Sequence, residues 1–212
     1  MKRRLFNSTL GCAAIGVWST AAQSQGGPIE GKHYLRLKEP APVSAPAGKV
    51  DVVEFFWYGC PACNALEPAL EPWTKRLKPD VSFRRVPVAF GAVHESHQRL
   101  FYTLDAMGQL EALHARVFAA IHNGQQRLDK EADQVAFVRA QGVDPAKFAE
   151  TAKSFSVQTR MRQAKQLAQA YQIEGVPTLG VQGRFVTSVA MAGDAARALA
   201  VVDYLVAQVR RG

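Results

Sequence analysis

Cysteine is scarce in this sequence, since only Cys12, Cys60 and Cys63 occur among 212 residues. A chain of this length with 48% hydrophobic residues can bury a substantial core, so its stability does not depend on disulfides. The scarcity also argues against a zinc site built from two cysteine pairs. We therefore expect the two cysteines that stand three positions apart to have a chemical role.

The N-terminal segment lacks acidic residues and any long hydrophobic run. Three basic residues at positions 2–4 precede a short apolar stretch at positions 10–18 and then small residues, which is typical of an export signal. A membrane anchor would need about 20 apolar residues. We predict a signal peptide over residues 1–24, cleaved near Ala22 or Ser24.

Cys12 allows a second interpretation of this segment, because Leu10-Gly11-Cys12 resembles the lipobox of a lipoprotein. The residues before Cys12 form a poor apolar segment and the apolar stretch continues beyond it, so an ordinary signal peptide is favoured. After cleavage, Cys60 and Cys63 would be the two cysteines of the mature chain.

Clusters of basic residues interleaved with aromatic residues are also missing. The formal net charge of +8 includes the three basic residues of the signal segment, so the mature chain would carry +5. Its lysines and arginines are scattered along polar helix faces, which indicates solvated surface. We expect no nucleic-acid partner.

The hydrophobic pattern predicts an α/β fold in which helices interrupt a sheet. Apolar runs indicate strands at residues 34–37, 50–57, 81–88, 178–181 and 184–188, the last two joined by a tight turn at Gln182-Gly183. Spacings of three and four indicate helices at residues 61–77, 94–107, 111–122, 131–141, 145–153, 157–171 and 195–210. The expected division is a first part at 25–90, a helical insertion at 91–171 and a second part at 172–212.

Cys60 and Cys63 lie where the strand at 50–57 gives way to a helix. Pro61 suits the first helical turn, where its missing N–H would have no partner. Residues three apart share a helical face, so the two sulfurs can approach each other. The free N–H groups of the helix favour a thiolate at Cys60. We expect Cys60 to be the exposed attacking and leaving sulfur and Cys63 to be the resolving thiol.

Two other interpretations of the pair are a metal site and a structural disulfide. A zinc site commonly needs about four ligands, and the histidines of His94-Glu95-Ser96-His97 have the wrong spacing for a zincin motif. We expect His94 and His97 to be exposed in the first turn of a helix, and His33, His114 and His122 to be ordinary surface or packing residues. A disulfide closing so short a loop would stabilise the fold little, so redox chemistry is favoured.

A second signal lies at Gly175-Val176-Pro177-Thr178, just before a predicted strand. A proline at the first residue of a strand after such a turn is a candidate for a cis peptide bond. Together with FFWYGCPAC at residues 55–63 and the helical insertion, this segment resembles the DsbA family of periplasmic thiol oxidases. The similarity spans about residues 28–210.

The resemblance implies a thioredoxin fold with a large inserted α-helical domain, a periplasmic location and, as we expect, a monomer. It also implies that an unstable Cys60–Cys63 disulfide acts without a metal or other cofactor. A thiolate of an unfolded exported protein would attack Cys60, and a second client thiol would resolve the mixed disulfide. A membrane quinone reductase of the DsbB type would then reoxidise the pair.

Three further positions can be assigned from the resemblance. Glu54 matches the family's buried acid six residues before the first cysteine, where it could exchange a proton with Cys63 through water. Its alternative role is structural, as the partner of Arg84 or Arg85. Val176 and Pro177 match the cis-proline loop, whose backbone aligns an extended substrate beside the sulfurs.

One residue departs from the family pattern, since Ala62 stands where the usual dipeptide has histidine. Without an imidazole at this position, we predict a higher Cys60 pKa and a less oxidising pair than in the usual member. A disulfide reductase or isomerase is therefore an alternative to the oxidase, although an isomerase would generally carry a dimerisation domain. A peptide-binding chaperone or metal carrier is the alternative of another class.

Overall fold

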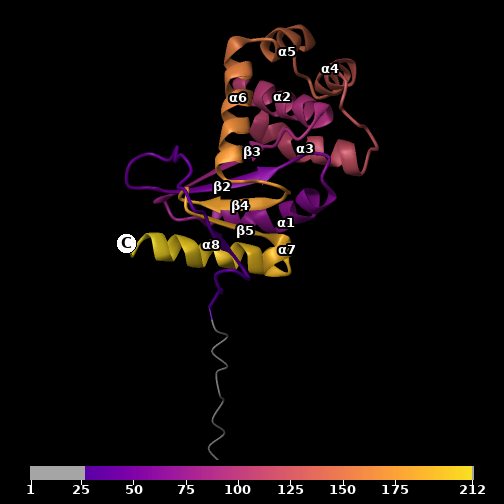
Figure 1. The fold of residues 1–212 in the computed structure, drawn as a ribbon. Helices are drawn as coiled ribbons and strands as arrows, with labels where there is room; N and C mark the ends of the chain where they lie inside the picture. The colour runs from indigo at the N-terminus through magenta and orange to yellow at the C-terminus, as the bar shows by residue number, and fades with distance from the viewer. Residues whose placement is uncertain (1–26, 212) are drawn as a thin grey trace, which may run out of the picture.

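The structure, a computed structural model, describes residues 27–211, so the predicted signal peptide and Cys12 lie outside the described part of the chain. Its strands form one sheet with the order β1-β5-β4-β2-β3 (Figure 1). They are β1 (Leu35–Arg36), β2 (Val50–Phe56), β3 (Val81–Pro87), β4 (Thr178–Val181) and β5 (Phe185–Ser188). Each strand was predicted to within one residue at either end. The α/β class is thus confirmed.

The described helices fall into two groups on opposite sides of this sheet (Figure 1). On one side lie α2 (Ala92–Ala106), α3 (Leu110–His122), α4 (Glu131–Ala140), α5 (Pro145–Ala152) and α6 (Phe155–Ala170). On the other side lie α1 (Pro61–Lys75), α7 (Val189–Ala192) and α8 (Ala195–Val209). The short α7 was not predicted, because four residues are too few to show a helical period; the Ser188 side chain caps it by accepting from the Met191 N–H.

β2 is buried along its whole length and connects the two hydrophobic cores. Val52 packs with apolar residues of α1 and α8, whereas Val53 and Phe55 belong to the core that the helical insertion completes. A strand covered on both faces requires a nearly continuous apolar run. Asp51 and Glu54 are the two acidic exceptions in this strand.

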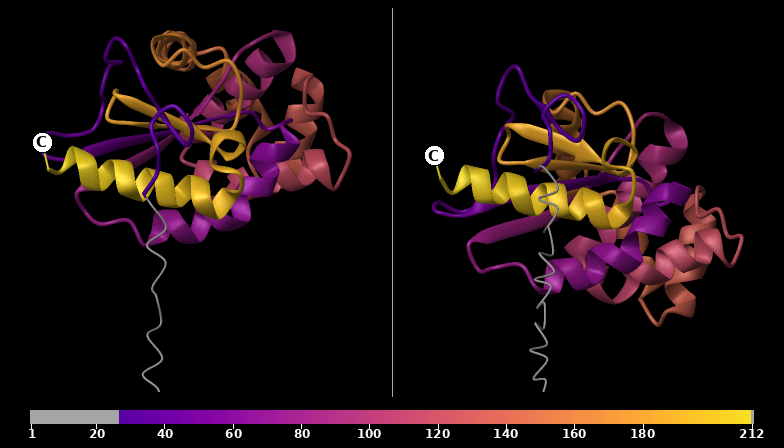
Figure 2. Two further views of the ribbon diagram at one scale, coloured as in Figure 1. Left: turned by 60° about the horizontal axis from the view of Figure 1, so that its bottom comes forward. Right: turned by 90° about the horizontal axis from the view of Figure 1, so that it is seen from below.

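Pairing within the sheet places the ends of β2 and β4 together. β2 runs parallel to β3, with α1 as the crossover, and antiparallel to β4. Phe55 pairs with Thr178, so the end of β2 that leads into the cysteine motif lies beside the segment that precedes β4. Figure 2 shows the same arrangement from below, with α8 lying along the sheet. Among the helices of residues 27–211, none has the length and apolar character needed to cross a membrane.

Candidate active site

Cys60 is the N-cap residue of α1, and Pro61 occupies the first turn as predicted. The Cys60 sulfur accepts a hydrogen bond from the Cys63 N–H at 3.3 Å, which brings the two cysteines together at the start of the helix. No disulfide joins the two cysteines in this structure. Cys63 is fully buried, as expected for the inner thiol.

The exposure predicted for Cys60 is wrong, because the residue is only 8% exposed. The loop before β4 covers it: the Cys60 thiol lies 3.4 Å from the Val176 carbonyl oxygen, to which its S–H donates. A thiolate has no proton to donate, so this contact exists only while Cys60 is protonated. Ionisation of Cys60 therefore loosens its contact with the loop.

The surroundings of Cys60 favour its thiolate. The pKa of Cys60 is lowered to about 6, mainly by a hydrogen bond from the Cys63 thiol. Burial opposes this shift, whereas the backbone N–H groups of Cys63 and Ala62 and the charge of His122 add to it. The hydrogen bond to Cys60 and burial both raise the pKa of Cys63. The pKa values of the two thiols thus shift in opposite directions, and Cys60 ionises before Cys63 as the pH rises.

The peptide bond between Val176 and Pro177 is cis, which confirms the prediction made from the sequence. These two residues and Ala62 line one groove of 540 Å³ beside the cysteines. Its other walls come from the loop before β4, from β5 and from α7, including Met191. Position 62 therefore forms part of the surface of this groove.

Glu54 is fully buried in β2, between Leu179 of β4 and Arg85 of β3. Its Oε2 atom lies 3.0 Å from Arg85 Nε, an ion-pair distance, but neither carboxylate oxygen accepts a hydrogen bond. Of the two partners considered from the sequence, Arg85 is the one that contacts Glu54. Arg84 instead forms two hydrogen bonds to the buried Asp51.

The environment of Glu54 opposes its ionisation. Burial raises the pKa of Glu54 to about 8; the charge of Arg85 acts in the opposite direction, and the charges of Glu67 and Cys60 add to the increase. A carboxylic acid that holds its proton near neutral pH beside a redox pair can exchange that proton with a sulfur.

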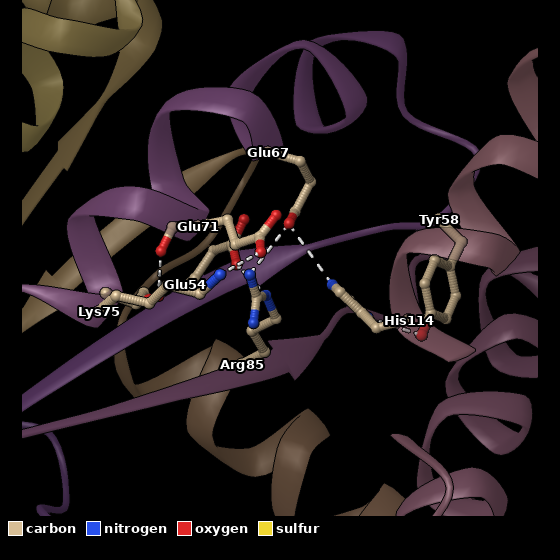
Figure 3. A network of polar contacts seen from close by, with 8 residues as sticks. Glu54, Tyr58, Glu67, Glu71, Lys75, Arg85 and His114 are labelled. Atoms are coloured by element: carbon tan, nitrogen blue, oxygen red, sulfur yellow. Dashed lines mark hydrogen bonds and ion pairs between the residues drawn. The ribbon is translucent and has the colours of Figure 1, made fainter. Parts of the chain in front are cut away.

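A chain of polar contacts extends from Glu54 across the base of the active site (Figure 3). Arg85 Nη2 donates to both oxygens of Glu67, on α1, at 3.3 and 3.0 Å. Glu67 Oε1 lies 3.4 Å from His114 Nε2, and His114 Nδ1 lies 2.8 Å from the Tyr58 hydroxyl. These contacts connect Tyr58, just before the cysteine motif, to Glu67, one turn after it.

The histidine predictions need correction. His97 is 2% exposed, and its Nε2–H donates to the Arg127 carbonyl oxygen at 2.8 Å. His94 is half-buried, with its ring centroid 4.2 Å from that of Trp57. Both were expected to be exposed, but Trp57 and the loop that contains Arg127 cover them.

His114 and His122 also have more specific contacts than the sequence suggested. His114 joins the chain of contacts described above, and the Nε2–H of His122 donates to the Tyr58 carbonyl oxygen at 2.8 Å. The signal for this role was the spacing of His114, Phe118 and His122, four residues apart, which places all three on one face of α3. Within residues 27–211, no group of three or more His, Cys, Asp or Glu side chains is arranged to hold a metal ion.

Comparison with known proteins agrees with this arrangement. The model of the DSBA-like thioredoxin domain matches residues 51–200. The thiol:disulfide interchange protein DsbA of Pseudomonas aeruginosa is 43% identical over 180 residues, 85% of each chain. The protein of that name from Bordetella pertussis is 42% identical over 215 aligned positions, which cover both chains completely.

Solved structures agree as well. The crystal structure of Pseudomonas aeruginosa DsbA matches with a TM-score of 0.83 and 42% identity, covering 87% of this chain and 95% of that one. The oxidoreductase DsbA of Xylella fastidiosa matches with a TM-score of 0.82 and 31% identity, covering 87% and 99%.

The fold and the cysteine pair define a class, the thiol:disulfide oxidoreductases with a thioredoxin fold and an inserted helical domain. Within that class, the chain belongs to the DSBA-like thioredoxin domain family, as the resemblance of its motifs implied.

Proposed function

We propose that Cys60 and Cys63 are the redox-active pair and that the protein donates their disulfide to exported proteins as they fold in the periplasm. The observation that carries this proposal is the position of Cys60 at the N-cap of α1, where its sulfur accepts from the Cys63 N–H at 3.3 Å beside the cis peptide bond of Val176 and Pro177. These surroundings lower the pKa of Cys60, whereas the hydrogen bond to Cys60 and burial raise that of Cys63. A stable thiolate at Cys60 favours the reduced form of the pair, which makes the disulfide an oxidant.

The proposed reaction has two exchange steps. A client thiolate attacks the Cys60 sulfur; the Cys60–Cys63 bond breaks, and Cys63 leaves with the bonding electrons and takes up a proton. A second client thiolate then attacks the client sulfur of the mixed disulfide, and Cys60 leaves as a thiolate. The two client thiols are oxidised to a disulfide, the pair is reduced by two electrons, and the remaining proton goes to solvent.

In this scheme Glu54 supplies the proton that Cys63 needs. Cys63 leaves as a thiolate in a buried position that disfavours charge, and Glu54 carries a proton at neutral pH beside it. Transfer through water leaves the Glu54 carboxylate next to Arg85, 3.0 Å away, which stabilises it until solvent returns the proton.

The groove beside Ala62 is the proposed site of the client segment. Backbone groups of Val176 and Pro177 would align an extended peptide with the Cys60 sulfur. A membrane quinone reductase of the DsbB type would use the same approach to reoxidise the pair, as the resemblance implies.

The test is to mix the oxidised protein with a reduced client peptide that carries two cysteines, and to measure the equilibrium of the pair against glutathione. We expect rapid oxidation of the client and loss of this activity in Cys60→Ser. Cys63→Ser cannot form the internal disulfide, but its Cys60 thiolate should attack the disulfide of an oxidised client peptide and remain trapped as a mixed disulfide. A strongly reducing equilibrium would assign the protein as a reductase. If the Cys60→Ser variant still binds and protects the client, the protein acts as a chaperone.

A further inference from the structure

One guanidinium, that of Arg85, serves two carboxylates. Its Nε atom lies 3.0 Å from Glu54 Oε2, whereas its Nη2 atom donates to both oxygens of Glu67, the shorter contact at 3.0 Å. A single positive charge cannot balance two negative charges, so the group carries a net negative charge unless one carboxylate takes a proton. In a buried position such a charge is costly.

The two carboxylates compete unequally for Arg85. Glu67 is still 17% exposed at its side chain and accepts hydrogen bonds, whereas Glu54 is fully buried and its oxygens accept none. A carboxylate is stabilised by the hydrogen bonds that it accepts. The proton therefore belongs on Glu54, and Glu67 remains ionised.

His114 fixes Glu67 in this position. The Tyr58 hydroxyl can donate a hydrogen bond to Nδ1 of His114, whereas an ionised Glu67 can only accept one from Nε2 (Figure 3). A neutral His114 imidazole with its proton on Nε2 therefore satisfies both contacts. Burial lowers the pKa of His114, despite the opposing effect of Glu67, and so keeps it neutral. His114 thus orients Glu67 without adding a positive charge that would relieve Glu54.

We propose that Glu67, held by His114, is a positioning residue that occupies Arg85 and thereby keeps Glu54 protonated, ready to deliver a proton to Cys63. This proposal rests on the proton-donor role proposed for Glu54. The charged and titratable groups around the site come from every element packed against it: Arg84 and Arg85 on β3, Tyr58 and Cys60 in the turn before α1, Cys63, Glu67, Glu71 and Lys75 on α1, Asp105 on α2, Glu111 and His114 on α3, and Arg160 on α6.

The test compares Glu67→Gln with Glu71→Gln. Glu71 lies one turn further along α1, is exposed and pairs with Lys75 at 2.7 Å, so it is a matched control that removes the same charge from the same helix. In Glu67→Gln, Arg85 is free to pair with Glu54 alone, and the pH midpoint of the Glu54 carboxyl should fall by about 1 to 2 pH units. Carbon NMR of labelled glutamate side chains in the oxidised protein measures it directly.

The kinetic readout is the rate at which a client thiol attacks the oxidised protein, measured against pH. Each variant's rate is divided by the wild-type rate at the same pH, because this removes the effect of ionisation of the client thiol. For Glu67→Gln this ratio should fall below one as the pH rises through the lowered Glu54 midpoint, whereas for Glu71→Gln it should stay near one over the whole pH range. Because His114→Gln can still donate to Glu67, it should behave as the wild type, whereas His114→Leu should move toward Glu67→Gln. An unchanged Glu54 midpoint in Glu67→Gln would overturn the proposal.

Combination with Glu54→Gln separates this proposal from the one on which it rests. If Glu67 acts through Glu54, the double variant Glu54→Gln/Glu67→Gln has the pH profile of Glu54→Gln alone. A further change in the double variant would show that Glu67 acts by another route. A wild-type profile for Glu54→Gln would instead refute the proton-donor role itself.

Discussion

Ala62 is exposed at the edge of the groove and contributes no charged group to Cys60. The thiolate is stabilised there by the Cys63 thiol, by backbone N–H groups and by His122. Ala62→His would add an imidazole on the first turn of α1, so we predict a lower Cys60 pKa and a more oxidising pair. Thiolate absorbance measured against pH checks this, and an unchanged or higher pKa would refute it.

The Cys60 pKa of about 6 also predicts how the reduced protein responds to pH. Since this pKa is lower in the folded protein than in the unfolded chain, Cys60 stabilises the reduced fold at high pH, and that contribution disappears as the pH falls through about 6. We expect alkylation of Cys60 to show a midpoint near this value. Cys63→Ala provides a control, because it removes the side chain that donates to the Cys60 thiolate and should therefore move the midpoint upward.

Sequence reasoning predicted the cysteine pair at a helix start and the cis proline, but it did not give most of the contacts that surround them. The CxxC spacing and the proline at 177 are local signals, and each is read directly from neighbouring residues. The contacts of Glu54 with Arg85, and of Tyr58 with His114, join residues that lie 31 and 56 positions apart. Which of two adjacent arginines faces a buried acid depends on the register of β2 and β3, which composition does not determine.

At the scale of elements, the turn between β2 and α1 depends on a close approach of Gly59 to Trp57. A Cβ atom at position 59 would lie 2.3 Å from the indole ring. Gly59→Ala must therefore displace Trp57 from its contact with the His94 ring, and we expect it to destabilise the fold by roughly 1–3 kcal/mol. Gly175→Ala is the control, because its Cβ would meet nothing within 4 Å. Equal denaturation midpoints for the two variants would contradict the prediction.

Helix α3 holds the same turn from the other side through His122. Its Nε2–H satisfies the carbonyl oxygen of Tyr58 at 2.8 Å. His122→Leu leaves that carbonyl without its partner and should cost about 1–3 kcal/mol of unfolding free energy, whereas His122→Gln can restore the donor. Chemical denaturation of both variants measures the difference. If His122→Gln proves as unstable as His122→Leu, the hydrogen bond is not the source of the effect.

At the scale of the whole molecule, Glu54 should make stability depend on pH. Its pKa is raised from 4.5 to about 8, so between these values the folded protein binds a proton that the unfolded chain has lost. Stability relative to Glu54→Gln should fall as the pH rises through this window, by about 1.4 kcal/mol per pH unit. Urea denaturation of both proteins from about pH 5 to 9 tests this. A difference that stays constant would exclude a raised pKa.

The overall architecture was predictable because hydrophobic periodicity is strong in most elements. The strands at 50–56 and 81–87 and the helices of the insertion are long enough to show their period. The sequence did not predict that Cys60 and His97 are buried, because the residues that cover them come from distant parts of the chain. Exposure depends on which surfaces meet, and one sequence alone does not specify this.

The order of strands in the sheet also has a consequence for how the chain folds after its synthesis. β4 lies at the centre of the sheet, yet it begins at Thr178, more than a hundred residues after its neighbour β2 ends at Phe56. Such non-local pairing slows folding, because a long loop must close before its contacts form. Until then β2 has an unpaired edge, and the cysteines lack the loop that covers them. A newly emerging molecule is thus open to reaction at its own thiols before it can act on those of others.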